Sequence, residues 1–308
     1  MSAIHTENLS KTYRSGWKRD RKAAVSMLNI DVREGEIFGF LGPNGAGKTS
    51  TIHMLLNLLR PSSGAAFLFD RPVAETAVHR RIGYLPESVN LHGYYTGRAL
   101  LEFYASLCGV PAEVRGARVS SLLKLLKLEE AAGKNVSKYS KGMAQRLGFA
   151  QAMLHEPDLL ILDEPTASLD PVGRKEFRDI LVDLKRQGKT VFISSHILSE
   201  VESICDRVAI LQDGELKRIG SLQELSGGTG TDLIVKGLPS DLMAALAATS
   251  AEVTLLHGEF KIHCADETLR ATVEDLLRRH RIEIVRSETT AQSLEQIFFS
   301  IINPATHP

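Results

Sequence analysis

The chain has 308 residues, enough for one large and one small domain, and its apolar content of 43% is ordinary for a globular protein. Lysine plus arginine and aspartate plus glutamate number 37 each, so no overall field attracts nucleic acid and we expect no nucleic-acid partner. The three cysteines are too widely spaced to predict a zinc site or a disulfide framework. The N-terminal segment lacks a signal-peptide pattern, and no stretch approaches the roughly 18 apolar residues that span a bilayer, which predicts a cytoplasmic protein.

Short apolar runs alternate with helical patterns along the first two thirds of the chain. The runs at 37–41, 159–162 and 191–193 are bounded by glycine, charged or turn residues, as expected of strands buried on both faces. Apolar residues in 177–184 recur with helical spacing, which predicts a helix packed against a sheet. Strands that alternate with helices predict an α/β fold with a mostly parallel central sheet.

A glycine-rich loop follows the first apolar run and precedes a helical pattern. Its sequence is Gly42-Pro43-Asn44-Gly45-Ala46-Gly47-Lys48-Thr49, which matches G-x-x-x-x-G-K-[ST], and Ser50 follows as a further candidate for nucleotide binding. Glycines allow backbone N–H groups to surround phosphate oxygens, and the helix that follows points its positive end at the same anion. We expect Lys48 to reach the β- and γ-phosphates of ATP and Thr49 to coordinate Mg²⁺.

From about Gly97 to Leu154 the strand pattern disappears and helical patterns dominate, so we expect a helical insertion. The next apolar strand ends in Asp163 and Glu164. Adjacent strand residues point to opposite faces, so the two acids are free to have different roles. We expect Asp163 to lie in the shell of Mg²⁺ and Glu164 to act as general base toward water.

A third motif, Tyr139-Ser140-Lys141-Gly142-Met143, lies between the glycine-rich loop and the acidic pair. In this order and spacing the three motifs resemble ATP-binding-cassette (ABC) ATPases, although this motif departs from the usual leucine-serine-glycine-glycine-glutamine at three positions. The resemblance implies a P-loop NTPase fold of the ABC type over residues 1–225, with a helical subdomain at about 90–155. It also implies that Ser140 and Gly142 bind the γ-phosphate held by a second copy, so that a homodimer encloses two nucleotides.

The same resemblance gives roles to four further residues. Tyr13 lies where the family stacks an aromatic ring on adenine, although an ordinary aromatic at a strand end is the alternative. Asp170 belongs to a loop that touches the opposing cassette, and before Pro171 it also has the pattern of a helix N-cap. His196 matches a switch histidine that senses the γ-phosphate, which gives Lys48, Glu164 and His196 as catalytic residues. Glu87 replaces a glutamine that contacts Mg²⁺ and water, and would add charge near the metal.

The last quarter of the chain predicts a second domain. Residues 226–230, Ser-Gly-Gly-Thr-Gly, have the composition of a linker. Beyond them the patterns predict a hairpin around 257–258, a helix across 269–277, a strand containing Ile282 and Ile284, and an amphipathic helix at the end. We expect residues 226–308 to form a small α/β domain with a role in dimerisation or regulation.

The motifs at 139–143 and 85–87 and the C-terminal ending resemble exporter cassettes that pair with separate six-helix permeases, among them drug-resistance exporters and the cassette used in nitrous oxide reductase maturation. The resemblance implies an ATP-hydrolysing subunit that drives export, with integral membrane permeases as partners and a peripheral position on the inner face of the cell membrane. Residues 91–96 are our candidate for the permease contact, with an ordinary exposed loop as the alternative. The alternative function is a soluble regulatory ABC ATPase, of the translation or DNA-maintenance type.

Overall fold

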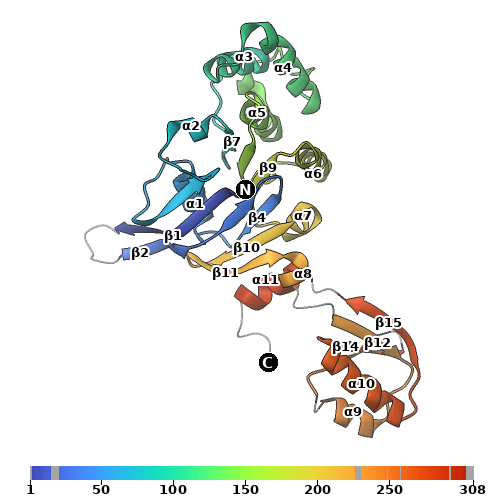
Figure 1. Cartoon of the computed structure of the whole chain (residues 1–308). Coiled ribbons are helices and arrows are strands. Elements are labelled where there is room, and N and C mark those ends of the chain that lie inside the picture. Colours follow the sequence, from blue (N-terminus) through green and yellow to red (C-terminus); the bar gives the residue numbers. More distant parts are fainter. Residues whose placement is uncertain are drawn as a thin grey trace. The chain divides into compact units, whose positions relative to one another are not determined.

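The computed structural model describes residues 2–14, 21–225, 230–247, 249–256, 258–290 and 293–302. The chain forms two compact units, Met1–Ile219 and Gly220–Pro308 (Figure 1), a division a few residues before the predicted boundary at 225. None of the helices in these described ranges combines the length and the apolarity that crossing a bilayer requires.

The first unit is built around a six-stranded sheet. Its strands lie in the order β11-β10-β4-β9-β8-β7, and the five from β10 to β7 are parallel, as the sequence predicted. Helices cover both faces of the sheet. Helices α5 and α6 pack on one face, where Phe149 and Phe177 contact each other, and α1 packs against the other face. The bounds are β4 (Ile37–Leu41), α1 (Lys48–Leu55), β7 (Ile82–Leu85), β8 (Leu159–Asp163), α6 (Pro171–Arg186), β9 (Thr190–Ser195), α7 (Leu198–Ile204), β10 (Arg207–Gln212) and β11 (Glu215–Ser221).

A second, antiparallel sheet lies on the α1 side of the first unit and was not predicted. Its apolar side chains share one core with α1 and with the inner face of the parallel sheet. The sequence gives little sign of this sheet, because register shifts in β1 break the alternation of apolar and polar residues. Its strands are β1 (Ser2–Arg14), β2 (Arg21–Leu28), β3 (Asp31–Arg33), β5 (Ser63–Leu68) and β6 (Arg71–Pro72).

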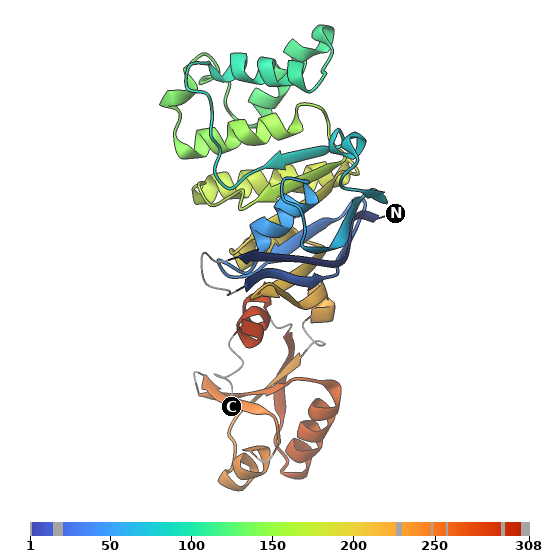
Figure 2. The same cartoon turned by 90° about the vertical axis from the view of Figure 1, so that its left-hand side faces the viewer.

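The predicted helical insertion is present at one end of the first unit (Figure 2). A short helix, α2 (Thr76–His79), precedes β7, and the insertion follows it. Glu176 of α6 joins the insertion to the sheet through ion pairs with Lys127 at 2.6 Å and Arg146 at 2.9 Å. The insertion contains α3 (Gly97–Leu107), α4 (Ala112–Leu125), a 3₁₀ turn (Val136–Lys138) and α5 (Lys141–Met153).

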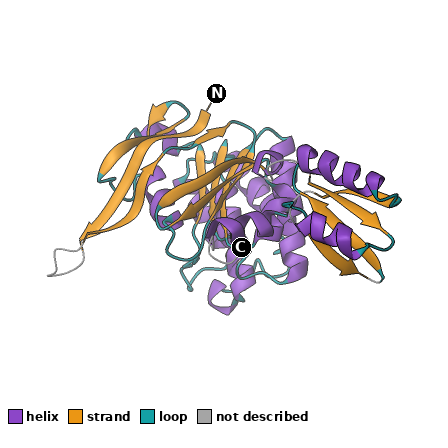
Figure 3. Cartoon of the chain, turned by 90° about the horizontal axis from the view of Figure 1, so that it is seen from below, coloured by secondary structure: helices purple, strands orange, loops and turns teal. Residues whose placement is uncertain are grey.

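In the second unit, two helices cover one face of a four-stranded sheet of order β13-β14-β12-β15 (Figure 3). The predicted hairpin and helices are present. The strand prediction at 282–284 was partly wrong, since β15 begins at Ile284, and Gly230 lies in a strand rather than in a linker. Residues 226–229 lie outside the described residues. The elements are α8 (Leu222–Leu225), β12 (Gly230–Val235), α9 (Ser240–Ala247), β13 (Glu252–Leu256), β14 (Glu259–Cys264), α10 (Glu267–Arg279), β15 (Ile284–Thr290) and α11 (Leu294–Ile302).

Candidate functional site

The glycine-rich loop connects the end of β4 to the start of α1. Gly45 and Gly47 have φ values of 84° and 104°, a left-handed conformation that favours glycine. At Gly47 space is also limiting, because a Cβ would lie 2.2 Å from the carbonyl oxygen of Ala24. Helix α1 begins directly at Lys48, so the first amides of the helix have no partner within it and are available to an anion.

Lys48 is buried within this loop, with 7% of its surface exposed. Its Nζ donates a hydrogen bond to the carbonyl oxygen of Gly42 at 2.7 Å and lies 3.3 Å from Oε1 of Glu164. A buried ammonium group is stable only when it is paired in this way. Lys48 is therefore held at the loop by two oxygens of its own chain.

Glu164 and His196 form a pair at the ends of β8 and β9. Nδ1 of His196 lies 2.7 Å from Oε2 of Glu164. Glu164 adopts the left-handed conformation, with φ at 47°, and its backbone N–H donates to the carbonyl oxygen of Ser194 at 3.2 Å and to the hydroxyl of Ser194 at 3.0 Å. The other carboxylate oxygen, Oε1, is buried without a hydrogen bond. One oxygen of Glu164 therefore pairs with His196 and the other faces the ammonium group of Lys48, and this carboxylate is a group able to accept a proton from water.

Thr49 and Asp163 provide oxygen atoms beside this pair. The hydroxyl of Thr49 donates to Oδ2 of Asp163 at 3.0 Å, and the hydroxyl of Ser194 donates to Oδ1 at 2.5 Å. Burial, and then the charge of Asp163, raise the pKa of Tyr84 to about 12. Mg²⁺ prefers oxygen ligands and often combines one or two protein ligands with phosphate oxygens. The described residues contain no cluster of three or more His, Cys, Asp or Glu side chains able to hold a metal.

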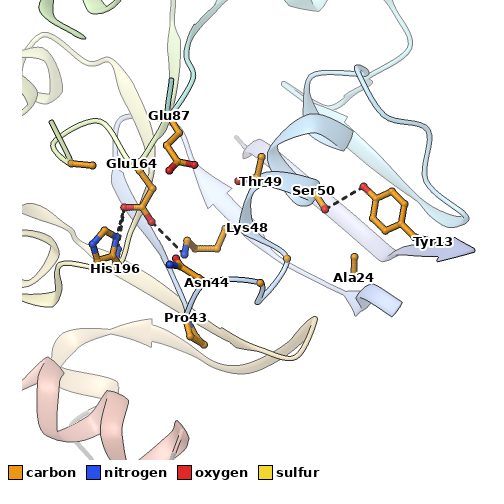
Figure 4. Close-up of a pocket in the computed structure, with 13 residues that line it drawn as sticks. Tyr13, Ala24, Pro43, Asn44, Lys48, Thr49, Ser50, Glu87, Glu164 and His196 are labelled. Atoms are coloured by element: carbon orange, nitrogen blue, oxygen red, sulfur yellow. Dashed lines mark hydrogen bonds and ion pairs between the residues drawn. The ribbon is translucent and has the colours of Figure 1, made fainter. Parts of the chain in front are cut away.

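These residues surround one cavity of about 540 Å³, shown in Figure 4. Tyr13 of β1 stands at one side, where its hydroxyl lies 3.4 Å from that of Ser50, and 44% of its surface is exposed. Glu87, just after β7, lies exposed above Thr49 and Glu164. The cavity is lined by Tyr13, Ala24, Pro43, Asn44, Gly45, Gly47, Lys48, Thr49, Ser50, Glu87, Glu164, Ala167 and His196.

Six predicted site residues do not line this cavity. Gly42, Ala46 and Asp163 lie within or beside the phosphate loop, whereas Ser140, Gly142 and Asp170 belong to other segments. Ser140 is exposed and caps helix α5, where its hydroxyl accepts the N–H of Met143 at 3.2 Å. Asp170 is also exposed and caps α6 by accepting the N–H of Gly173 at 2.9 Å, as its position before Pro171 predicted. A single chain therefore does not bring the third motif to the phosphate loop.

Sequence reasoning missed Ser194, Ala24 and Ala167. Ser194 bonds to both members of the acidic pair from inside β9, and no motif in the sequence gave it a role. The position of Ser194 at the end of a predicted strand could have indicated its role. Parallel strands end at one edge of the sheet, and there the last side chains of β8 and β9 meet. Ala24 and Ala167 line the cavity as small residues and carry no pattern that distinguishes them.

The parallel sheet, with a phosphate loop at the end of β4 and an acidic pair at the end of β8, places the first unit among the P-loop ATPases. Comparison with known proteins gives the family. Residues 25–167 match the model of the ABC transporter family. The chain is 46% identical to an uncharacterised ABC transporter ATP-binding protein of Nostoc sp., over 75% of this chain and 70% of that protein.

Two further relatives match almost from end to end. The bacitracin transport ATP-binding protein BcrA of Bacillus licheniformis is 36% identical over 98% of both chains. A fluoroquinolones export ATP-binding protein of Mycobacterium tuberculosis is 34% identical over 90% of this chain and 87% of that protein. The solved dimer of the ATP-binding cassette MJ0796 with ADP and phosphate, 26% identical, superposes with a TM-score of 0.66 over 71% of this chain and 98% of that one. The chain belongs to the ATP-binding subunits of ABC transporters, a family of ATP-hydrolysing cassettes.

Proposed function

We propose that two copies of this chain close around two molecules of Mg-ATP and that this closure drives export through a separate membrane permease. The observation that supports it most is the incomplete site. Lys48, Glu164 and His196 face one cavity, whereas Ser140 lies exposed on another part of the same unit. A second copy that presented its Ser140 to this cavity would complete the enclosure of the nucleotide.

Within one copy, the chain's own groups divide the work. The backbone N–H groups of residues 44–50 and the Nζ of Lys48 hold the phosphates, and Tyr13 stacks on the adenine. Glu164 accepts the proton of the attacking water at Oε1, which Lys48 faces when no nucleotide is bound, while His196 holds Oε2 and contacts the γ-phosphate. Thr49, Asp163 and Glu87 would hold Mg²⁺, which when bound would offset the charge of the phosphate oxygens.

The second copy contributes the start of its helix α5 and its Asp170 loop. The helix has 13 residues, and its first amides point away from the helix, so they suit the γ-phosphate held by the opposing loop. A Cβ at Gly142 would meet Ser168 and Leu169 only at ordinary distances, 3.4 and 3.6 Å. Glycine at 142 is thus not demanded by packing within the chain, which supports a close approach from outside.

An exposed aromatic surface supports a permease partner. Tyr94 is 96% exposed, Tyr95 stacks on Phe103 with ring centroids 6.0 Å apart, and Leu107 one turn further along α3 is 68% exposed. Exposed aromatic residues are enriched at protein interfaces. The proposed direction of transport follows the relative named for fluoroquinolones export. The permease would hold the chain at the cytoplasmic face of the membrane.

The second unit assists dimerisation or regulation in this proposal. It has its own core around Leu233, Ile262 and Val273, which is the property of an autonomous module. Deleting the chain after residue 228 is expected to reduce assembly or alter the ATPase rate. Unchanged assembly, ATPase activity and transport in the truncated chain would remove this role.

A soluble regulatory ABC ATPase is the alternative function. Isolating the chain from its native membranes separates the two. We expect an integral membrane protein to accompany it, and ATPase activity to change when that protein is removed. Recovery of the whole pool from the soluble fraction, with full ATPase activity and no membrane protein, would favour the regulatory alternative.

A further inference from the structure

A buried carboxylate outside the cavity joins the elements that carry the catalytic residues. Glu200 lies in α7, four residues after His196, and only 4% of its surface is exposed. Its Oε2 accepts a hydrogen bond from the hydroxyl of Thr166 at 2.5 Å. Thr166, itself 3% exposed, follows Glu164 by two residues in the loop that ends at Asp170. Glu200 therefore ties the helix that follows His196 to the loop that follows Glu164.

The second oxygen of Glu200 connects to the far end of the same loop. Oε1 lies 3.6 Å from the guanidinium of Arg174 in α6. Nε of Arg174 donates to the carbonyl oxygen of Leu169 at 3.0 Å, between Ser168 and Asp170. The loop is thus held near both its ends by one buried acid, directly through Thr166 and indirectly through Arg174.

Burying a charged side chain under a helix has a desolvation cost that an apolar side chain does not have. Replacing a buried ion pair with apolar residues is often neutral or stabilising, so such a pair is weak evidence for a role in stability alone. Oε1 of Glu200 is also buried without a hydrogen bond, although an ion pair faces it. The arrangement favours a role in fixing the relative positions of the loop and the helix, because charge-assisted hydrogen bonds are directional and apolar contacts are not.

We propose that Glu200 is a positioning residue for ATP hydrolysis: through Thr166 and Arg174 it sets the 165–170 loop relative to the His196 turn. The inference rests on the proposed function, in which Glu164 and His196 act on one nucleotide and the Ser168–Asp170 loop faces the opposing copy. Because Glu200 is linked to one end of that loop directly through Thr166 and to the other end through Arg174, displacement of the turn at His196 is passed to the surface that meets the partner. Loss of the link leaves Glu164 and His196 present but misaligned.

The test compares variants of the full-length chain that keep side-chain volume. Thr166→Val removes the hydroxyl, Thr166→Ser retains it, and Glu200→Gln removes the charge. We expect Thr166→Val and Glu200→Gln to lower kcat by about tenfold to 10²-fold, the scale of a small misplacement of reacting groups, with the ATP dissociation constant unchanged. Thr166→Ser is expected to restore kcat. Ser199→Ala, at an exposed position of the same helix, is the matched control and should hydrolyse ATP at the wild-type rate.

Coupling between the two residues gives a second readout. The double variant Thr166→Val/Glu200→Gln should lose no more activity than the more severe single variant, because both remove one link. Wild-type kcat in both single variants, or a loss in Thr166→Ser equal to that in Thr166→Val, would overturn the proposal. So would losses that follow the thermal midpoint of unfolding, since these indicate a structural role. If the wild-type chain neither binds nor hydrolyses ATP, the proposed function fails instead.

Discussion

The surroundings of Glu164 and of Ser140 differ in how far one chain completes them. Glu164 is buried and bonded to Lys48, Ser194 and His196, so its geometry is set before any ligand arrives. Ser140 is exposed, and its bond is to the backbone of its own helix. The difference indicates that one chain builds the catalytic half of the site in full and offers the other half to a neighbour.

The largest effect on ATP turnover is expected for substitution of the buried residue Glu164. Glu164→Gln keeps the shape of the side chain but removes the proton acceptor. We expect turnover to fall by about 10²- to 10⁴-fold while ATP binding is retained. Steady-state hydrolysis with a parallel measurement of nucleotide affinity checks this, and turnover within the wild-type range would exclude Glu164 as the base.

A smaller effect is expected on the exposed side. Gly142→Ala adds a methyl group that the chain itself accommodates at ordinary distances, so folding and ATP binding should persist. The approach of a second copy should be impaired, with turnover lowered by about tenfold, the scale of one charge-assisted hydrogen bond. The matched control is Gly116→Ala in α4, where no atom lies within 4 Å of the new Cβ and activity should be unchanged. Equal behaviour of the two variants would erase the distinction between the regions.

Tyr13 lies between the two extremes, since it lines the cavity yet remains partly exposed. Tyr13→Ala is expected to weaken ATP binding by about 2- to 10-fold through loss of ring stacking, whereas Tyr13→Phe keeps the ring and should bind normally. Calorimetric titration with ATP measures both. An equal loss in the two variants would point to the hydroxyl and its contact with Ser50 instead.

The smallest effect concerns the joint between the helical insertion and the sheet. Hydrogen bonds from Lys127 and then Arg146 lower the pKa of Glu176. The stability that this pairing contributes is therefore fully present above the ordinary carboxyl pKa and is lost as pH falls through the lowered value. Glu176→Gln should cost at most about 1 kcal/mol at neutral pH and progressively less in acid. Denaturant unfolding at several pH values tests this, and a loss that grows toward low pH would contradict the sign.

The parts predictable from sequence are those where one residue type is demanded by local geometry. The phosphate loop needs glycine at 42, where a Cβ would lie 2.6 Å from the carbonyl oxygen of Leu211, and at 47, where φ is 104°, and these are the two glycines that the motif specifies. Glu164 and His196 could be placed near each other only through a family resemblance, because their contact joins two strands far apart in sequence. Strand β12 was missed because Thr231 and Asp232 occupy buried positions, where Asp232 pairs with Lys261 and His263. A buried polar residue that is stabilised by partners distant in sequence leaves no local pattern from which a strand can be predicted.

The most direct measurement is the mass of the Glu164→Gln chain in saturating Mg-ATP, determined by light scattering after size exclusion. The account predicts a species of twice the chain mass of 33.8 kDa, and a return to single chains when Ser140→Arg is added to the same variant. A Glu164→Gln chain that binds Mg-ATP yet stays single, or a dimer that forms equally well with Ser140→Arg, would contradict a nucleotide site completed by the neighbouring copy.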